Sequence, residues 1–200
     1  VGGEAVGVWT GAFGRGAYFS NIRYTARPPA APAQPSPAPR GTLASWQISD
    51  AFDATAFAPA TLPNLAGMRW ENVVAEPQGF VLISRYRRSP QISFPFDQKT
   101  GEPLVDLMMG GQVPGSKVVF ARTTIESDRD ETKRMLFGYV NGAVIYANGR
   151  PLFFGTDTGG GTMNMNGDGV YLPLKKGANE IVFAITNFTG GWGFWARLDS

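Results

Sequence analysis

The chain has 200 residues, of which 43% are hydrophobic and 12% aromatic, enough to bury one sizeable core. Its 26 glycines and 15 prolines, against 17% charged residues, favour a chain that turns often, as all-β proteins do. There is no histidine and no cysteine, which excludes disulfides, thiolate nucleophiles and the commonest general base and transition-metal ligand. Any catalysis would therefore depend on carboxylates, lysine, tyrosine or serine.

The formal net charge of +2 is concentrated near the start of the sequence. Residues 1–40 contain four of the 18 basic and one of the 16 acidic residues, which leaves 14 basic and 15 acidic residues after them. Because nucleic-acid binding needs many cations on one face, we expect no nucleic-acid partner. No apolar run approaches the roughly 20 residues of a membrane span, so none is expected. The start at Val1, without an initiator methionine, is typical of an excised or processed piece.

A proline-rich and alanine-rich stretch divides the chain. PPAAPAQPSPAP, residues 28–39, favours an extended polyproline II path, and we expect a linker over residues 28–40. Before it, residues 1–27 contain two short strand patterns in VGVWTGAFGRGAYFSNIRYT. Because two isolated strands are marginal in water, residues 1–27 are interpreted as the terminal strands of a truncated or preceding β domain.

Residues 41–200 are predicted to form one antiparallel two-sheet sandwich without a convincing helix. Strands are expected where apolar residues alternate or run between turn residues: 43–48, 79–86, 117–125, 135–140, 143–147, 151–154, 169–172, 180–186 and 193–198.

Two Asn-Gly pairs give the strongest turn signal. Asn141-Gly142 and Asn148-Gly149 bracket a five-residue apolar segment, and Asn-Gly readily takes the positive φ angles of type I′ turns. This pattern predicts a tight antiparallel meander. YLPLKKGANEIVFAI then predicts a strand, a turn and a return strand, with Ile181, Phe183 and Ile185 facing the same way.

The run VNGAVIYANGRPLFFG, followed by VYLPLKKGANEIVFAITNFTGGWGFWARL, resembles the galactose-binding-like jelly-roll β-sandwich. This module accompanies catalytic domains in β-galactosidases and in bacterial secreted carbohydrate-active proteins. VVFARTTIESDRDETKRMLFGY fits the same pattern, so the resemblance covers about residues 43–198. It departs at Val140-Asn141, where a Ser-Asp pair often stands. WTGAFGRGAYFSNIRYT is similar to the last strands of a concanavalin-like or laminin-G-like sandwich.

The resemblance implies a non-catalytic carbohydrate-binding or accessory module of a larger extracytoplasmic protein, secreted, periplasmic or at the cell surface. A fold does not fix a function, so two alternatives stay open. One is part of a glycoside hydrolase or polysaccharide lyase that acts through carboxylates, and the other is a structural spacer. Glycoside hydrolysis needs two converging carboxyl groups, but the densest acidic stretch, ESDRDE, is interpreted as a solvated turn. We expect no catalytic activity from this chain alone.

The aromatic segment TGGWGFWARL suggests a ligand site. If residues 192–198 form a strand, alternation places Trp192 and Phe194 in the core and Trp195 and Arg197 on the opposite face. An exposed Trp195 beside Arg197 would stack on a sugar ring while the guanidinium donates to its hydroxyls. The alternative is that Trp195 packs under a loop with Arg197 across its face. Trp195, Arg197 and Phe188 are the candidate ligand-binding residues.

A glycine-rich loop suggests a second possible site. FGTDTGGGTMNMNGDG carries alternating oxygen side chains, which a hard cation such as calcium selects. The candidate ligands of a structural calcium ion are Asp157, Asn164, Asn166 and Asp168. The pattern only partly follows an EF-hand loop, and a long flexible loop at the mouth of the sandwich is the alternative. No other cofactor is expected.

Overall fold

The structure is a computed structural model that describes residues 38–88, 115–156, 167–187 and 191–199. Residues 1–27 and most of the predicted linker lie outside the described residues, so both remain predictions. The described residues consist of β-strands, connecting segments and two 3-10 helices of three residues, Ala54–Ala56 and Ile83–Arg85. This confirms the all-β prediction. Within the described residues, no helix has the length and apolar character that crossing a membrane requires.

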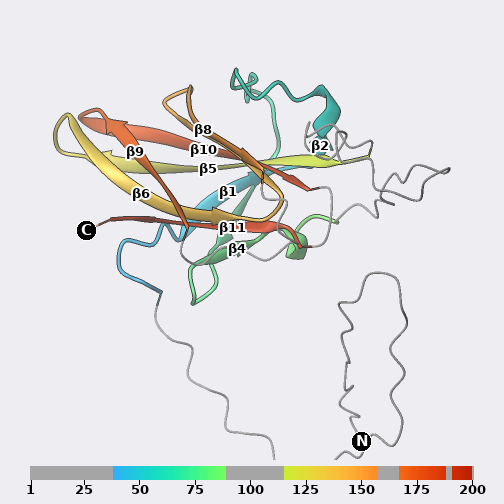
Figure 1. The fold of residues 1–200 in the computed structure, drawn as a ribbon, viewed down its shortest axis with the longest axis horizontal. Coiled ribbons are helices and arrows are strands. Elements are labelled where there is room, and N and C mark those ends of the chain that lie inside the picture. The colour runs from blue at the N-terminus through green and yellow to red at the C-terminus, as the bar shows by residue number, and fades with distance from the viewer. Residues whose placement is uncertain (1–37, 89–114, 157–166, 188–190, 200) are drawn as a thin grey trace, which may run out of the picture. The chain divides into compact units, whose positions relative to one another are not determined.

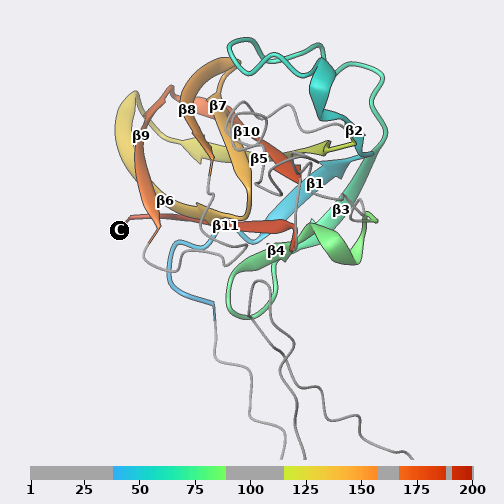
Figure 2. The ribbon, with the colours of Figure 1, turned by 45° about the vertical axis from the view of Figure 1, so that its right-hand side comes forward.

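Two antiparallel sheets lie face to face as two layers (Figures 1 and 2). The larger sheet has the order β3-β1-β5-β10-β7-β8, with β2 paired to β5. The smaller sheet has the order β4-β11-β6-β9. The two sheets confirm the predicted sandwich and fit the galactose-binding-like fold. The strands of the larger sheet are β1 (Ser45–Ser49), β2 (Phe52–Asp53), β3 (Trp70–Val74), β5 (Lys117–Ser127), β7 (Gly142–Ala147), β8 (Arg150–Thr156) and β10 (Gly177–Asn187), and those of the smaller sheet are β4 (Phe80–Leu82), β6 (Glu131–Tyr139), β9 (Asp168–Leu174) and β11 (Gly193–Leu198).

The core lies between the two sheets and is centred on aromatic side chains. The rings of Trp46, Phe183 and Phe194, from β1, β10 and β11, have centroids 4.8 to 5.2 Å apart. Ile181, Phe183 and Ile185 all face this core, as their alternation predicted. Trp192 and Phe194 are buried there too, which confirms their assignment to the core.

The predicted meander is correct for only one of its two turns. Asn148 and Gly149 both have positive φ and join β7 to β8 in a hairpin. The meander prediction is wrong at Asn141-Gly142, because β6 belongs to the smaller sheet and β7 to the larger one. Asn141 alone takes a positive φ there, and Gly142 already belongs to β7. The buried segment Val140-Asn141 carries the chain from one sheet to the other.

Two further strand predictions need correction. The expected strand 79–86 ends at Leu82, because residues 83–85 form a 3-10 helix. This change of direction lets Arg87 donate to Ser49 O (2.8 Å) and Glu71 Oε2 (2.6 Å), on β1 and β3 of the other sheet. Strand β3 was not predicted, because only Val73 of its five residues is buried and its apolar residues do not alternate.

The outer face of the larger sheet is partly covered by the connection between β2 and β3. Phe57, Leu62, Leu65 and Met68 of this connection, together with Trp70 of β3, pack on a second apolar cluster that contains Tyr146. Tyr146 is fully buried, and its hydroxyl donates to Pro59 O at 2.7 Å. This bond connects the covering segment to β7.

Burial raises the pKa of Tyr146 from its ordinary value of 10.0 to about 12. The folded state therefore favours the neutral phenol, and the associated stability is complete below about pH 10. We expect it to be lost progressively as the pH rises from 10 towards 12, because the unfolded chain ionises first. Urea unfolding at increasing pH measures this loss. Tyr146→Phe should remove this contribution to the slope of the unfolding free energy against pH. It should also lower the free energy of unfolding at neutral pH by about 1 kcal/mol. An unchanged slope would contradict the prediction.

Candidate functional site

The structure places Trp195 and Arg197 together on the outer face of the smaller sheet. In β11, Trp195 lies opposite Phe80 of β4 and Gly138 of β6. Gly138 has no side chain to displace the indole, and the backbone of Gly167 covers the indole edge. A Cβ at Gly167 would lie 2.7 Å from Trp195 Cζ2. Trp195 is consequently only 7% exposed.

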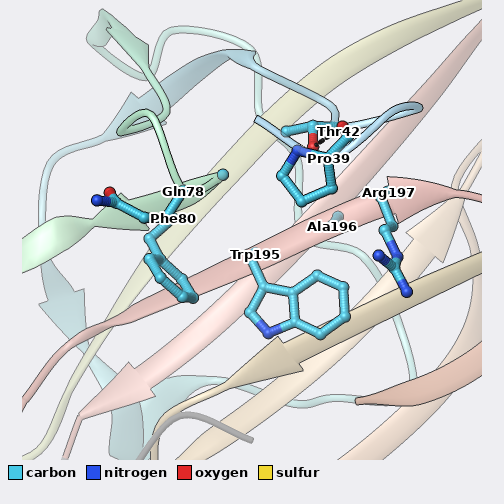
Figure 3. A pocket seen from close by; sticks show the side chains of 8 residues that line it. Pro39, Thr42, Gln78, Phe80, Trp195, Ala196 and Arg197 are labelled. Atoms are coloured by element: carbon cyan, nitrogen blue, oxygen red, sulfur yellow. Dashed lines mark hydrogen bonds between the residues drawn. The ribbon is translucent and has the colours of Figure 1, made fainter. Parts of the chain in front are cut away.

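A small pocket lies beside this tryptophan and is called the Trp195 pocket below. Figure 3 shows Trp195 between Phe80 and Arg197, with Pro39 and Thr42 nearby. The guanidinium carbon of Arg197 lies 5.7 Å from the centroid of the Trp195 ring, within the range of a cation–π contact. The position of both side chains is that of the packing alternative. Their role in ligand binding remains a prediction.

The size of the Trp195 pocket limits what it holds. Its volume is about 40 Å³, room for about three water molecules. The segment that enters the domain closes it, since Leu43 N donates to Ala196 O (2.9 Å) and Leu198 N donates to Gly41 O (2.9 Å). The backbones of Thr42 and Arg197 also pair as an isolated antiparallel β-bridge. The pocket volume lies far below the lower end of about 300 Å³ that is typical of small-molecule sites.

The other predicted site residues are not brought together in the described part of the chain. Phe188 and the calcium candidates Asp157, Asn164 and Asn166 lie outside the described residues. Asp168 is exposed at the start of β9, opposite Phe137. Among the described residues, no group of three or more His, Cys, Asp or Glu side chains is arranged to hold a metal ion. The calcium site therefore remains a prediction.

A larger hollow lies on the larger sheet, where two of its central strands separate. Strands β1 and β5 pair only at Gln47↔Arg122 and Ile48↔Ala121. Beyond these pairs, Thr123 Oγ1 donates to Ser45 O (2.8 Å) in place of a backbone ladder. The resulting hollow has a volume of about 580 Å³ and is called the β1–β5 groove below. Its polar lining consists of Ser45, Gln47, Asn72, Arg122, Thr123, Thr124 and Glu180, and Trp46, Val73 and Val74 supply its apolar lining.

A row of polar side chains crosses four strands at this groove. The register places Gln47 opposite both Asn72 of β3 and Arg122 of β5, so these side chains share one face. Arg122 Nε donates to Gln47 Oε1 (2.9 Å), and Gln47 Nε2 donates to Asn72 Oδ1 (2.9 Å). On the other side, Arg122 Nη1 lies 3.9 Å from Glu180 Oε1 of β10. The hydrogen bonds orient the amides and the guanidinium.

Trp70 supports the row from one side. The guanidinium carbon of Arg122 lies 4.0 Å from the centroid of the Trp70 ring, a close cation–π contact. Among the described residues, the terminal N–H groups of Arg122, Asn72 Nδ2 and the Glu180 carboxylate make no hydrogen bond. They are also accessible, since the Arg122 and Glu180 side chains are 32% and 43% exposed. The groove thus offers fixed donors beside a carboxylate acceptor.

Sequence reasoning missed this groove. Gln47 is 25 residues from Asn72 and 75 from Arg122, so no local motif connects them. The available signal was Gln47 between Trp46 and Ile48, and Arg122 after the apolar run VVFA. In isolation, each is typical of an ordinary solvent-facing strand position.

No family model matches the sequence, and a comparison with curated proteins gave no match. Among solved structures, the chain is similar to a β-glucosidase from Kluyveromyces marxianus in complex with glucose, with 12% identity and a TM-score of 0.44 over 77% of this chain and 16% of the other. It is also similar to a family 35 carbohydrate binding module from Paenibacillus barcinonensis, with 16% identity and a TM-score of 0.33 over 62% of this chain and 94% of the other. A family 35 module from Clostridium thermocellum gives 18% identity and a TM-score of 0.32 over 42% of this chain and 71% of the other. The chain thus spans about one-sixth of the length of the β-glucosidase.

Proposed function

We propose that this chain is a non-catalytic carbohydrate-binding module and that the β1–β5 groove binds the sugar. The observation that carries the proposal is the hydrogen-bonded row Asn72–Gln47–Arg122 beside Glu180, held against Trp70. A sugar hydroxyl both donates and accepts, so it needs donors and acceptors side by side. The groove supplies donors that hydrogen bonds orient and, beside them, the carboxylate of Glu180 as acceptor.

The volume of the groove supports the same ligand class. At about 580 Å³ it lies within the range of about 300 to 1,000 Å³ that is typical of small-molecule sites. The Trp195 pocket, at about 40 Å³, lies far below that range. The exposed side chain of Val74 suits the C–H face of a sugar ring, and the polar row suits its hydroxyls.

The single carboxylate among the described lining residues of the groove favours binding over hydrolysis. Glycosidases use two carboxyl groups about 5 to 10 Å apart. Among the described residues that line the groove, Glu180 supplies the acidic side chain and has Arg122 beside it. Such a carboxylate is suited to accepting a hydrogen bond from a ligand hydroxyl.

The setting of the module forms part of the proposal. We propose an accessory role in a larger extracytoplasmic protein, secreted, periplasmic or at the cell surface. The proline-rich and alanine-rich composition of residues 28–40 supports this role, because such sequences act as semi-rigid spacers between domains.

A glycan array followed by calorimetry with the best ligand tests the function. Arg122→Met should lower the affinity about 10- to 100-fold, because a charge-assisted hydrogen bond contributes about 1.5 to 3 kcal/mol. Arg134→Met is the matched control, since Arg134 lies on β6 of the other sheet and is 50% exposed. It should bind like the wild type.

If the folded wild-type protein binds no glycan, the proposed function is contradicted and a structural spacer is favoured. Equal binding by the Arg122 and Arg134 variants would contradict the assignment to the groove. Turnover of a glycoside that a single Asp or Glu substitution abolishes would replace binding with catalysis.

A further inference from the structure

The β1–β5 groove presents one positive and one negative side chain to its ligand. Arg122 and Glu180 are both partly exposed, with Nη1 and Oε1 3.9 Å apart. This distance exceeds hydrogen-bond length, so the two groups compensate each other's charge without using all their hydrogen-bonding groups. The other polar groups of the lining are amides and hydroxyls from Ser45, Gln47, Asn72, Thr123 and Thr124. The described lining therefore has no net formal charge.

This balance bears on the class of glycan. A ring hydroxyl placed between the two groups accepts from an Arg122 or Asn72 N–H group and donates its own proton to Glu180. A ligand carboxylate or sulfate also accepts from Arg122, but it has no proton for Glu180 and lies next to a like charge. The Glu180 carboxylate repels a ligand anion that lies next to it, although solvent weakens this repulsion.

We infer that the groove selects neutral glycans with adjacent ring hydroxyls over uronate-containing or sulfated ones, an inference that rests on the proposed function. Glu180 is the specificity-determining residue. It accepts from the ligand hydroxyl and disfavours anionic sugars. Arg122 donates to both ligand classes, and Glu180 offsets the attraction of the guanidinium charge for an anionic sugar.

Glu180→Gln tests this role, because it keeps the size of the side chain and removes the charge. Neutral and uronate-containing oligosaccharides of matched length are titrated into wild type and variant. We expect the wild type to prefer the neutral ligand, and the variant to lose about 5- to 20-fold in affinity for it. The ratio of neutral to acidic affinity should fall, because the repulsion of the acidic ligand is removed.

Glu126→Gln is the matched control. It makes the same change in charge on β5, at an exposed position outside the groove, and should leave both affinities unchanged. Thermal unfolding of the variants confirms that they are folded.

The outcomes separate the two proposals. A wild-type groove that prefers the acidic glycan, or a Glu180→Gln variant with an unchanged ratio, overturns the inference and leaves carbohydrate binding intact. Failure of the wild type to bind either class overturns the proposed function and the inference together.

Discussion

Replacing Trp192 with alanine is expected to lower the free energy of unfolding by about 3 to 5 kcal/mol. Trp192 is 1% exposed and belongs to the core cluster between the two sheets. Its Nε1 donates to Ile185 O at 3.1 Å, so truncation both opens a cavity and leaves a buried carbonyl without that partner. Urea unfolding followed by circular dichroism measures the loss.

Tyr171→Ala is the control for Trp192→Ala. It removes an aromatic side chain that is 68% exposed on β9, and should change the free energy of unfolding by no more than about 0.5 kcal/mol. If Trp192→Ala costs less than about 1 kcal/mol, the assignment of Trp192 to the core is wrong.

Trp195→Ala is expected to cost about 2 to 3 kcal/mol of stability while glycan affinity stays within about twofold of the wild type. Trp195 is 7% exposed, Gly167 covers the edge of its indole, and Arg197 lies 5.7 Å from its ring centroid. Its loss therefore removes packing, and the volume of about 40 Å³ beside it is too small for a sugar ring.

Parallel unfolding and binding measurements on Trp195→Ala distinguish packing from ligand binding. Unchanged stability with lost glycan binding would show that Trp195 stacks on the sugar. Trp70→Ala is the informative comparison, because its indole supports Arg122 in the β1–β5 groove and its loss should weaken binding.

The sequence predicted those parts of the fold in which successive side chains alternate between the two faces of one strand. Ile181, Phe183 and Ile185 face the core because every second residue of β10 does, and Trp192 and Phe194 follow the same rule around β11. The edge strand β3 escaped prediction because only Val73 of its five residues is buried. Its other positions carry no periodic signal.

Sheet membership was less predictable than strand position. An Asn-Gly pair indicates where the chain turns, but not whether the next strand joins the same sheet. Asn148-Gly149 makes a hairpin, whereas Asn141-Gly142 stands where the chain crosses to the other sheet. The difference depends on tertiary packing, since Val140 and Asn141 are buried and Asn148 is exposed.

Of the two pockets, sequence reasoning indicated only the residues beside Trp195. Alternation correctly placed Trp195 and Arg197 on one face, because they are two residues apart on one strand. Strand alternation does not predict that Gly138 and Gly167 lie beside the indole of Trp195 and allow its burial. The β1–β5 groove depends on the register between strands far apart in sequence, which a single sequence does not specify.

The most direct test of carbohydrate binding in the β1–β5 groove is an NMR titration of the isotope-labelled protein with its best array ligand. We predict that the amide signals of Gln47, Asn72 and Arg122 shift with ligand concentration, while those of Trp195 and Arg197 stay in place. Shifts confined to Trp195 and Arg197, with β1, β3 and β5 unchanged, would contradict the assignment of the ligand to the groove.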